Sequence, residues 1–119
     1  MKVYGIPNCG TVKKARAWLE AHGFDYSFHD FKKEAVSAGH LHAWEGRIGW
    51  EKLLKKTGTT WRALPEEAKH GLDRDKALAL LAAHHNLIRR PVVELPDGRL
   101  LAGFVEAEYQ AALSAMGKE

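Results

Sequence analysis

The first thirty residues of the chain leave few architectures open to it. Val3–Ile6 has the composition of a short strand, Pro7-Asn8 is typical of a turn, and apolar side chains recur at helical spacing over Thr11–His22. Gly23 is a typical helix end, and Tyr26–Phe28 alternates as strands do. A strand, a helix and a second strand this close together predict a right-handed βαβ crossover.

A helical region is predicted from about Glu34 to His85. Ser37 can cap its first helix, which Gly49 interrupts, and Thr57–Thr60 is expected to form a loop. Asp73 is predicted to begin the most regular helix. The inner face of that helix is expected to consist of Ala77, Leu80, Leu81 and His84.

The last third of the chain returns to strand patterns. Pro91–Leu95 and Arg99–Ala102 are predicted strands, joined by the tight turn Pro96–Gly98. A final helix is expected to bury Val105, Tyr109, Ala112, Leu113 and Met116.

The order of these elements predicts an α/β protein with a thioredoxin-like fold. It would have a four-stranded mixed sheet, with a helical insertion at about residues 34–85. No internal repeat, low-complexity segment or linker interrupts the pattern. Residues 1–119 are therefore expected to form a single domain.

Composition limits the classes of function. The chain has 119 residues with a formal net charge of +3, which permits anionic ligands, and it carries no aromatic–basic pattern typical of RNA binding. Nucleic acid is therefore not an expected partner. No apolar run reaches about 18 residues and no secretory signal is apparent, so neither a membrane span nor export is expected. A single cysteine excludes an internal disulfide and favours a reducing cytoplasm.

That cysteine, Cys9, lies between the first predicted strand and the helix. A thiol at a helix N-terminus faces unpaired backbone N–H groups and the positive end of the macrodipole. Lys13, Lys14 and Arg16 add positive charge, and each of these effects favours the reactive thiolate. A lone cysteine is often only a small buried side chain. Here its polar, glycine-bearing and cationic neighbours predict partial exposure and thiol chemistry.

The seven histidines invite a metal site, but none is expected. The pairs His40/His42 and His84/His85 lack companion ligands at a recognised zinc spacing. The sequence does not identify a base for Cys9, and the two histidines that could approach it are His29 and His85.

Five stretches in a characteristic order span nearly the whole chain: Tyr4–Ala15, Gly49–Leu54, Gly58–Arg62, Ile88–Pro91 and Leu100–Phe104. In this order they resemble the ArsC/Spx family of thioredoxin-fold proteins, and within it the YffB-like branch.

The resemblance implies a reductase-type site centred on Cys9. It implies that Arg90 precedes a proline, Pro91, whose peptide bond is cis, so that the main chain of residues 89–91 turns towards Cys9. That strip could pair with a peptide-like thiol such as glutathione.

The same resemblance makes arsenate a doubtful substrate. Arsenate reductases of this family surround the thiolate with three arginines, of which only Arg90 has a clear match. Lys55 stands near the first position, although Arg62 follows, and no basic side chain stands near the third, at Ala102-Gly103. A lysine lacks the bidentate fork of arginine.

The expected function is a glutathione-dependent thiol reductase with Cys9 and Arg90 as catalytic residues. Glutathione, a co-substrate rather than a bound cofactor, would resolve the mixed disulfide because the chain has no second cysteine. Arg90 and Arg62 would hold its carboxylates. The residues expected to bind substrate are Asn8, Gly10, Thr11, Lys13, Arg62 and Pro91.

Three of these residues have a second interpretation. Thr11 either donates a hydrogen bond to the sulfur or caps the helix. Lys13 either tunes the thiolate or is a solvated surface charge. Asn8 either orients the substrate or shapes the turn.

Two alternatives to this reductase follow from the same family. One is a non-catalytic, Spx-like regulator that contacts RNA polymerase; its Cys-x-x-Cys switch is excluded because Val12 occupies the second position. The other is an arsenate reductase linked to glutaredoxin. A small thiol or disulfide substrate and a monomeric state are expected.

Overall fold

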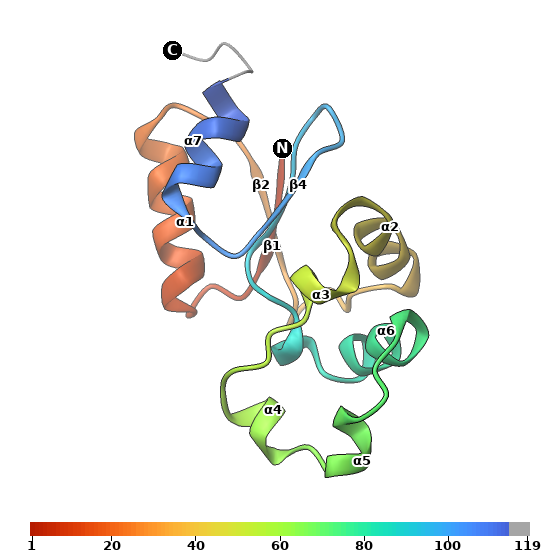
Figure 1. The fold of residues 1–119 in the computed structure, drawn as a ribbon. Helices are drawn as coiled ribbons and strands as arrows, with labels where there is room; N and C mark the ends of the chain where they lie inside the picture. Colours follow the sequence, from red (N-terminus) through yellow and green to blue (C-terminus); the bar gives the residue numbers. More distant parts are fainter. Residues whose placement is uncertain (115–119) are drawn as a thin grey trace. The chain divides into compact units, whose positions relative to one another are not determined.

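Four short strands form one mixed sheet in the computed structural model, which describes residues 1–114. They are β1 (Lys2–Gly5), β2 (Ser27–Asp30), β3 (Val92–Glu94) and β4 (Leu100–Ala102), and their order across the sheet is β2-β1-β3-β4. Figure 1 labels β1, β2 and β4. The central strand β1 is parallel to β2 and antiparallel to β3, and β3 is antiparallel to β4. The predicted four-stranded mixed sheet is confirmed.

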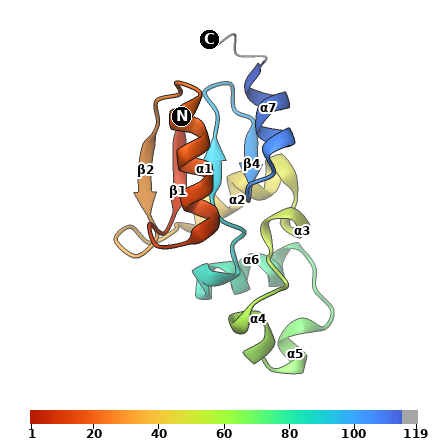
Figure 2. The ribbon, with the colours of Figure 1, turned by 90° about the vertical axis from the view of Figure 1, so that its left-hand side faces the viewer.

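Two helices, α1 (Gly10–Ala21) and α7 (Glu106–Ser114), cover the same face of this sheet (Figure 2). The helical spacing of apolar residues in α1 buries Val12, Ala15 and Leu19 as predicted. The core between sheet and helices consists of Val3, Ala15, Leu19, Val93, Leu95, Tyr109 and Leu113.

Residues predicted at the ends of the apolar faces of α1 and α7 need correction. His22 is exposed because it lies beyond the last residue of α1. Val105 is 51% exposed because it precedes α7, so the prediction that it is buried was wrong. Met116, assigned to the same stripe, lies outside the described residues.

The β3–β4 hairpin has the predicted turn. Gly98 has φ +93°, a conformation that a residue with a side chain rarely adopts. The Asp97 carboxylate accepts hydrogen bonds from the main-chain N–H (3.0 Å) and Nε (2.8 Å) of Arg99. These contacts fix the register in which Val93 pairs with Leu101.

The chain divides into two compact units. The sheet unit comprises residues 1–34 and the chain from residue 90 onward, and the helical unit is the continuous segment Ala35–Arg89. The helical unit corresponds closely to the predicted insertion. That residues 1–119 act as one domain stays a prediction.

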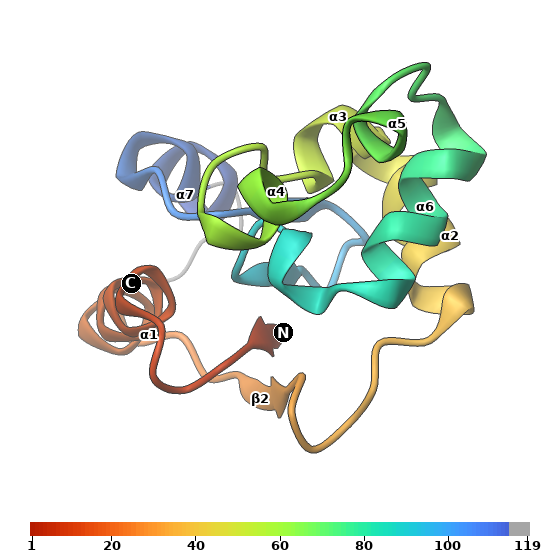
Figure 3. The ribbon, with the colours of Figure 1, turned by 90° about the horizontal axis from the view of Figure 1, so that it is seen from below.

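The helical unit is built around two neighbouring helices, α2 (Ala38–Ile48) and α6 (Arg74–Ala83), which pack together (Figure 3). Ser37 caps α2 as predicted, since its Oγ accepts the His40 N–H at 3.0 Å. Asp73 caps α6 in the same way. The shorter elements are α3 (Trp50–Leu53), α4 (Thr59–Ala63), α5 (Glu66–Lys69) and the 3-10 helix η1 (His85–Leu87).

Two predictions for this unit were wrong in detail. Thr59 and Thr60 begin α4 instead of completing a loop. The buried residues of α6 are Ala77, Leu78 and Leu81, so Leu80 and His84 do not belong to its buried face.

No helix in the described part of the chain has both the length and the apolar character needed to cross a membrane.

Candidate functional site

Cys9 lies at the junction between β1 and α1. The Cys9 N–H donates to the Ile6 carbonyl at 3.4 Å, which closes the turn formed by Pro7 and Asn8. Cys9 is the N-cap residue of α1 in an extended conformation, and its carbonyl accepts the Lys13 N–H at 2.9 Å. The thiol-bearing residue therefore stands at the helix end where the first backbone N–H groups have no intrahelical acceptor.

Polar residues surround Cys9 on the adjoining chain. The Cys9 side chain is half-buried, which confirms the predicted partial exposure. Its neighbours Asn8, Gly10, Thr11 and Lys13 are exposed, and no acidic residue lies in the first turn of α1. Both the helix end and the local charge are therefore positive at this position.

Thr11 is the second residue of α1, because the helix begins at Gly10 and Cys9 is its N-cap. The interpretation of Thr11 as the capping residue was therefore wrong. A hydrogen bond from Thr11 to the sulfur stays a prediction. Asn8 occupies the turn before the helix, in agreement with a turn-shaping role.

Pro91 lies at the same end of β1 as the turn that leads to Cys9. The register pairs Tyr4 with Val92, which places Pro91 beside Gly5. A Cβ atom on Gly5 would lie 3.8 Å from the Cβ of Pro91. The structure therefore brings the Arg90–Pro91 segment and the Cys9 turn to one end of the sheet.

The Arg90–Pro91 peptide bond is cis, as the resemblance implied. Pro91 is buried, and Arg90 is half-buried with its Nε shielded from solvent. Some polar groups of the 89–91 main chain are already engaged: the Arg89 N–H donates to Leu53 at 2.7 Å, and the Pro91 carbonyl accepts the Gly103 N–H at 2.9 Å. Pairing of the other main-chain groups of this strip with a peptide-like ligand stays a prediction.

Arg62 and Lys55 belong to the helical unit. Arg62 is exposed on α4, and its carbonyl lies 3.5 Å from the Lys69 Nζ. The Lys55 N–H donates to the Leu87 carbonyl at 2.8 Å, next to the bridge between Leu54 and Ile88. A role for either side chain at Cys9 stays a prediction.

Both ring nitrogens of His29 are already engaged. Its Nε2 lies 3.0 Å from the Ser27 Oγ and its Nδ1 lies 3.2 Å from Glu34, while its ring stacks on Tyr4. A role for His29 as a base for Cys9 stays a prediction. His85 lies in η1 of the helical unit.

A candidate metal centre is not apparent in the described chain. Within residues 1–114, no three His, Cys, Asp or Glu side chains are grouped so that they could hold an ion.

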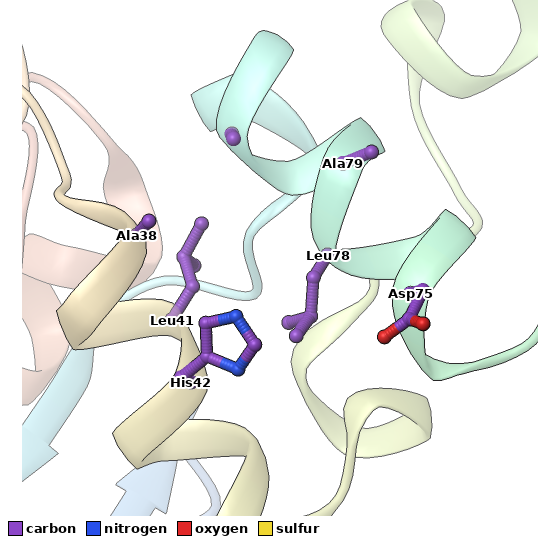
Figure 4. Close-up of a pocket in the computed structure, with 7 residues that line it drawn as sticks. Ala38, Leu41, His42, Asp75, Leu78 and Ala79 are labelled. Atoms are coloured by element: carbon purple, nitrogen blue, oxygen red, sulfur yellow. The ribbon is translucent and has the colours of Figure 1, made fainter.

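A pocket of about 310 Å³ lies in the helical unit between α2 and α6 (Figure 4). Its lining is mostly apolar, with Leu41 and Leu78 facing it from opposite helices and His42 between them. Asp75 also borders it, and its carboxylate is 3.2 Å from Arg74. None of the residues predicted to form the thiol site lines this pocket.

The close approach of α1 to Gly5 was not predicted from the sequence. A Cβ atom at this position would lie only 2.9 Å from Cγ2 of Val12 in α1. The available signal was a glycine within an otherwise apolar strand, which often marks a close approach of neighbouring groups.

Comparisons with known proteins agree with this architecture. The solved structure of the YFFB protein has 46% sequence identity and a TM-score of 0.88, covering 94% of this chain and 97% of that one. An arsenate reductase (ArsC) related protein from Brucella melitensis has 47% identity and a TM-score of 0.74, covering 92% and 91%. The global transcriptional regulator Spx of Streptococcus pyogenes is 28% identical, over 91% of this chain and 81% of its own.

The predicted resemblance to ArsC and Spx proteins and the predicted thioredoxin-like fold are both confirmed. Residues 4–112, which include the Cys9 turn and the Arg90–Pro91 segment, match the model of the ArsC family. This chain is a member of the ArsC family.

Proposed function

We propose that this protein is a glutathione-dependent thiol–disulfide reductase with Cys9 as its single nucleophile. The position of Cys9 carries the proposal, since a half-buried thiol stands at the N-cap of α1 at the same end of the sheet as Pro91. Thiolates are favoured at helix N-termini and beside cations. Likeness to an arsenate reductase (ArsC) related protein supports redox chemistry in general terms.

The reaction has two thiol–disulfide exchanges. The Cys9 thiolate attacks the glutathione sulfur of a mixed disulfide, forms a Cys9–glutathione disulfide and releases the other thiolate. A second glutathione thiolate then attacks that sulfur, which yields oxidised glutathione and regenerates the Cys9 thiolate. Because the chain has no other cysteine, the resolving thiol comes from solution.

Binding of glutathione is assigned to the groups around the Cys9 turn. Backbone N–H groups at Gly10 and Thr11 belong to the first turn of α1, where anionic groups are favoured. Arg90, with Pro91 beside it, contributes positive charge from the neighbouring segment. Lys13 adds a solvated charge, and Arg62 is a further proposed contact. Asn8 shapes the turn before Cys9.

Arsenate is a less suitable substrate than a disulfide. The third arginine position of the family's arsenate reductases falls near Gly103, which donates its N–H to the Pro91 carbonyl and has no side chain. Lys55 stands near the first position. Loss of two bidentate guanidinium groups weakens recognition of an oxyanion.

A second candidate is regulation by contact with RNA polymerase, which the 28% identity to Spx supports. In that case binding to RNA polymerase would not depend on the Cys9 thiol. Monomeric state and a reducing cytoplasm, in which glutathione is abundant, are part of the leading proposal.

The decisive experiment measures turnover of a glutathione mixed disulfide in the presence of glutathione. We expect turnover by the native chain and none by Cys9→Ser, with unchanged urea unfolding for the variant. Lys2→Ala, which removes an exposed lysine at the end of β1 away from the Cys9 turn, is the matched control and should retain activity within about threefold. A pH series of thiol labelling should give Cys9 a pKa below the ordinary value of about 8.5.

The proposal fails if the native chain shows no turnover, if Cys9→Ser retains it, or if labelling gives an ordinary thiol pKa. Retention of RNA polymerase in a pull-down by both the native chain and Cys9→Ser, together with absent turnover, would favour the regulator.

A further inference from the structure

We propose that Gly5 is a positioning residue for Cys9. By having no side chain, it allows the first turn of α1 to lie against the end of β1, and this contact sets the location of the thiol relative to Pro91. The inference rests on the proposed function, because it concerns the reactivity of Cys9.

The close approach at Gly5 is specific to one neighbour. A Cβ atom on Gly5 would lie 2.9 Å from Cγ2 of Val12, 3.5 Å from its Cγ1 and 3.8 Å from the Cβ of Pro91. Carbon atoms in favourable contact are about 3.5–4.0 Å apart, so only the Val12 Cγ2 contact requires movement. Gly5 is not among the glycines with positive φ, so its backbone conformation accepts any residue. The glycine is needed for space and not for conformation.

Neither the Val12 side chain nor the Gly5 main chain can move easily to relieve this contact. Val12 is fully buried, and a valine in a helix has one strongly preferred side-chain rotamer. Gly5 is paired with Asp30 of β2, and its carbonyl accepts the Phe31 N–H at 2.8 Å. An added methyl group at Gly5 must therefore displace the start of α1.

That displacement reaches Cys9 directly. Val12 is the third residue of α1, and the turn that contains it is closed by the hydrogen bond from the Lys13 N–H to the Cys9 carbonyl. The Cys9 N–H is bonded to Ile6, the residue after Gly5. A shift of this turn moves the sulfur relative to the Pro91 segment, and a misplacement of about 1 Å can cost a reaction about a hundredfold.

The test compares Gly5→Ala, Val12→Ala and the double variant Gly5→Ala/Val12→Ala. Gly46→Ala is the matched control, because a Cβ on this α2 glycine meets nothing within 4 Å. Two quantities are measured for each: the rate constant for reaction of Cys9 with an aromatic disulfide reagent over a pH series, and the urea unfolding curve. Turnover of the glutathione mixed disulfide is recorded separately.

We expect Gly5→Ala to react about tenfold more slowly than the native chain and Gly46→Ala to react normally. Val12→Ala should lower stability, since it empties a buried site, yet keep the rate within about threefold. The double variant should match Val12→Ala in rate, because the Val12 γ-methyl groups no longer obstruct the new Cβ. The labelling rate of Cys9 would then depend on whether a Cβ at Gly5 has room beside residue 12, and not on the free energy of unfolding.

The inference is overturned if Gly5→Ala reacts like the native chain, or if the double variant is more than about threefold slower than Val12→Ala. The comparison of the double variant with Val12→Ala still decides the inference if Gly5→Ala alone does not fold. Labelling reports on Cys9 without glutathione. A native chain that labels but does not turn over the mixed disulfide therefore refutes the proposed function, while the Gly5 comparison is decided by the labelling rates.

Discussion

Tyr109 connects α7 to the strand end beside the candidate site. Its hydroxyl donates to the Gly103 carbonyl at 2.8 Å, and the Gly103 N–H donates to the Pro91 carbonyl at 2.9 Å. Its ring packs edge-on against Phe104 and Trp18, with centroids 4.8 and 5.7 Å away. The residue therefore supports the Pro91 segment through one buried hydrogen bond and through aromatic packing.

We expect Tyr109→Phe to lower the free energy of unfolding by about 1–2 kcal/mol, because the Gly103 carbonyl loses its hydroxyl donor while the ring is kept. Tyr26→Phe is the control: the Tyr26 hydroxyl contacts Arg16 and Glu20 in a partly exposed place and should cost less. Urea unfolding measures both. Equal losses would contradict the importance of the buried bond.

At the level of single residues, the sequence predicted the position of Cys9 well and its surroundings less well. The strand–turn–helix pattern placed the thiol correctly at the start of α1, and its polar neighbours predicted its exposure. The Gly5–Val12 contact could not be predicted, because it depends on how closely the helix approaches the strand. Thr11 was wrongly considered as a cap because the helix begins one residue earlier than expected.

The N-cap of α2 is a local stabilising contact of the helical unit. The Ser37 Oγ accepts the His40 N–H at 3.0 Å and also lies 3.0 Å from the His40 Nδ1. We expect Ser37→Ala to cost about 1 kcal/mol of unfolding free energy, since a helix N–H loses its acceptor. Urea unfolding is again the measurement.

The control for this prediction is Ser114→Ala in α7, where the hydroxyl donates to the Ala111 carbonyl in the preceding turn. Alanine has the higher helix propensity, so this change should be neutral or slightly stabilising. If the two serine variants were equally stable, the capping contact of Ser37 would contribute nothing.

Secondary structure was predictable where local signals agreed and less so elsewhere. The capped helix α2 and the β3–β4 hairpin have strong end signals in Ser37 and in Pro96–Gly98. The short α4 was missed because Gly58 and two β-branched threonines disfavour a helix locally. The buried face of α6 was misassigned because this helix carries apolar residues on several of its faces, so their spacing does not single out one face.

At the scale of the whole molecule, two buried tyrosines are expected to lower the free energy of unfolding at alkaline pH. Burial, with a smaller contribution from the charge of Glu94, raises the pKa of Tyr4 to about 12. Burial likewise raises the pKa of Tyr109. An unfolded tyrosine has a pKa of about 10. Since the folded protein disfavours the phenolate, this contribution to stability is complete below about pH 10 and is lost as the pH rises through the folded pKa.

We therefore expect the free energy of unfolding to fall above about pH 10, and to fall less steeply in Tyr4→Phe than in the native chain. Tyr26→Phe serves for comparison: the pKa of Tyr26 is also raised, mainly by burial, but the residue is more exposed. Urea midpoints across this pH range test the prediction. Parallel curves for the native chain and Tyr4→Phe would show that Tyr4 does not contribute.

The order of the strands along the chain has a consequence during synthesis on the ribosome. The central strand β1 pairs with β2 nearby in sequence, but its other neighbour, β3, begins at Val92, after the whole helical unit. At roughly 5–20 residues per second, about 3–12 seconds separate the appearance of β2 from that of β3. During that interval the nascent β1 has one open edge, so an early chaperone that shields residues 2–5 would protect the chain from mispairing.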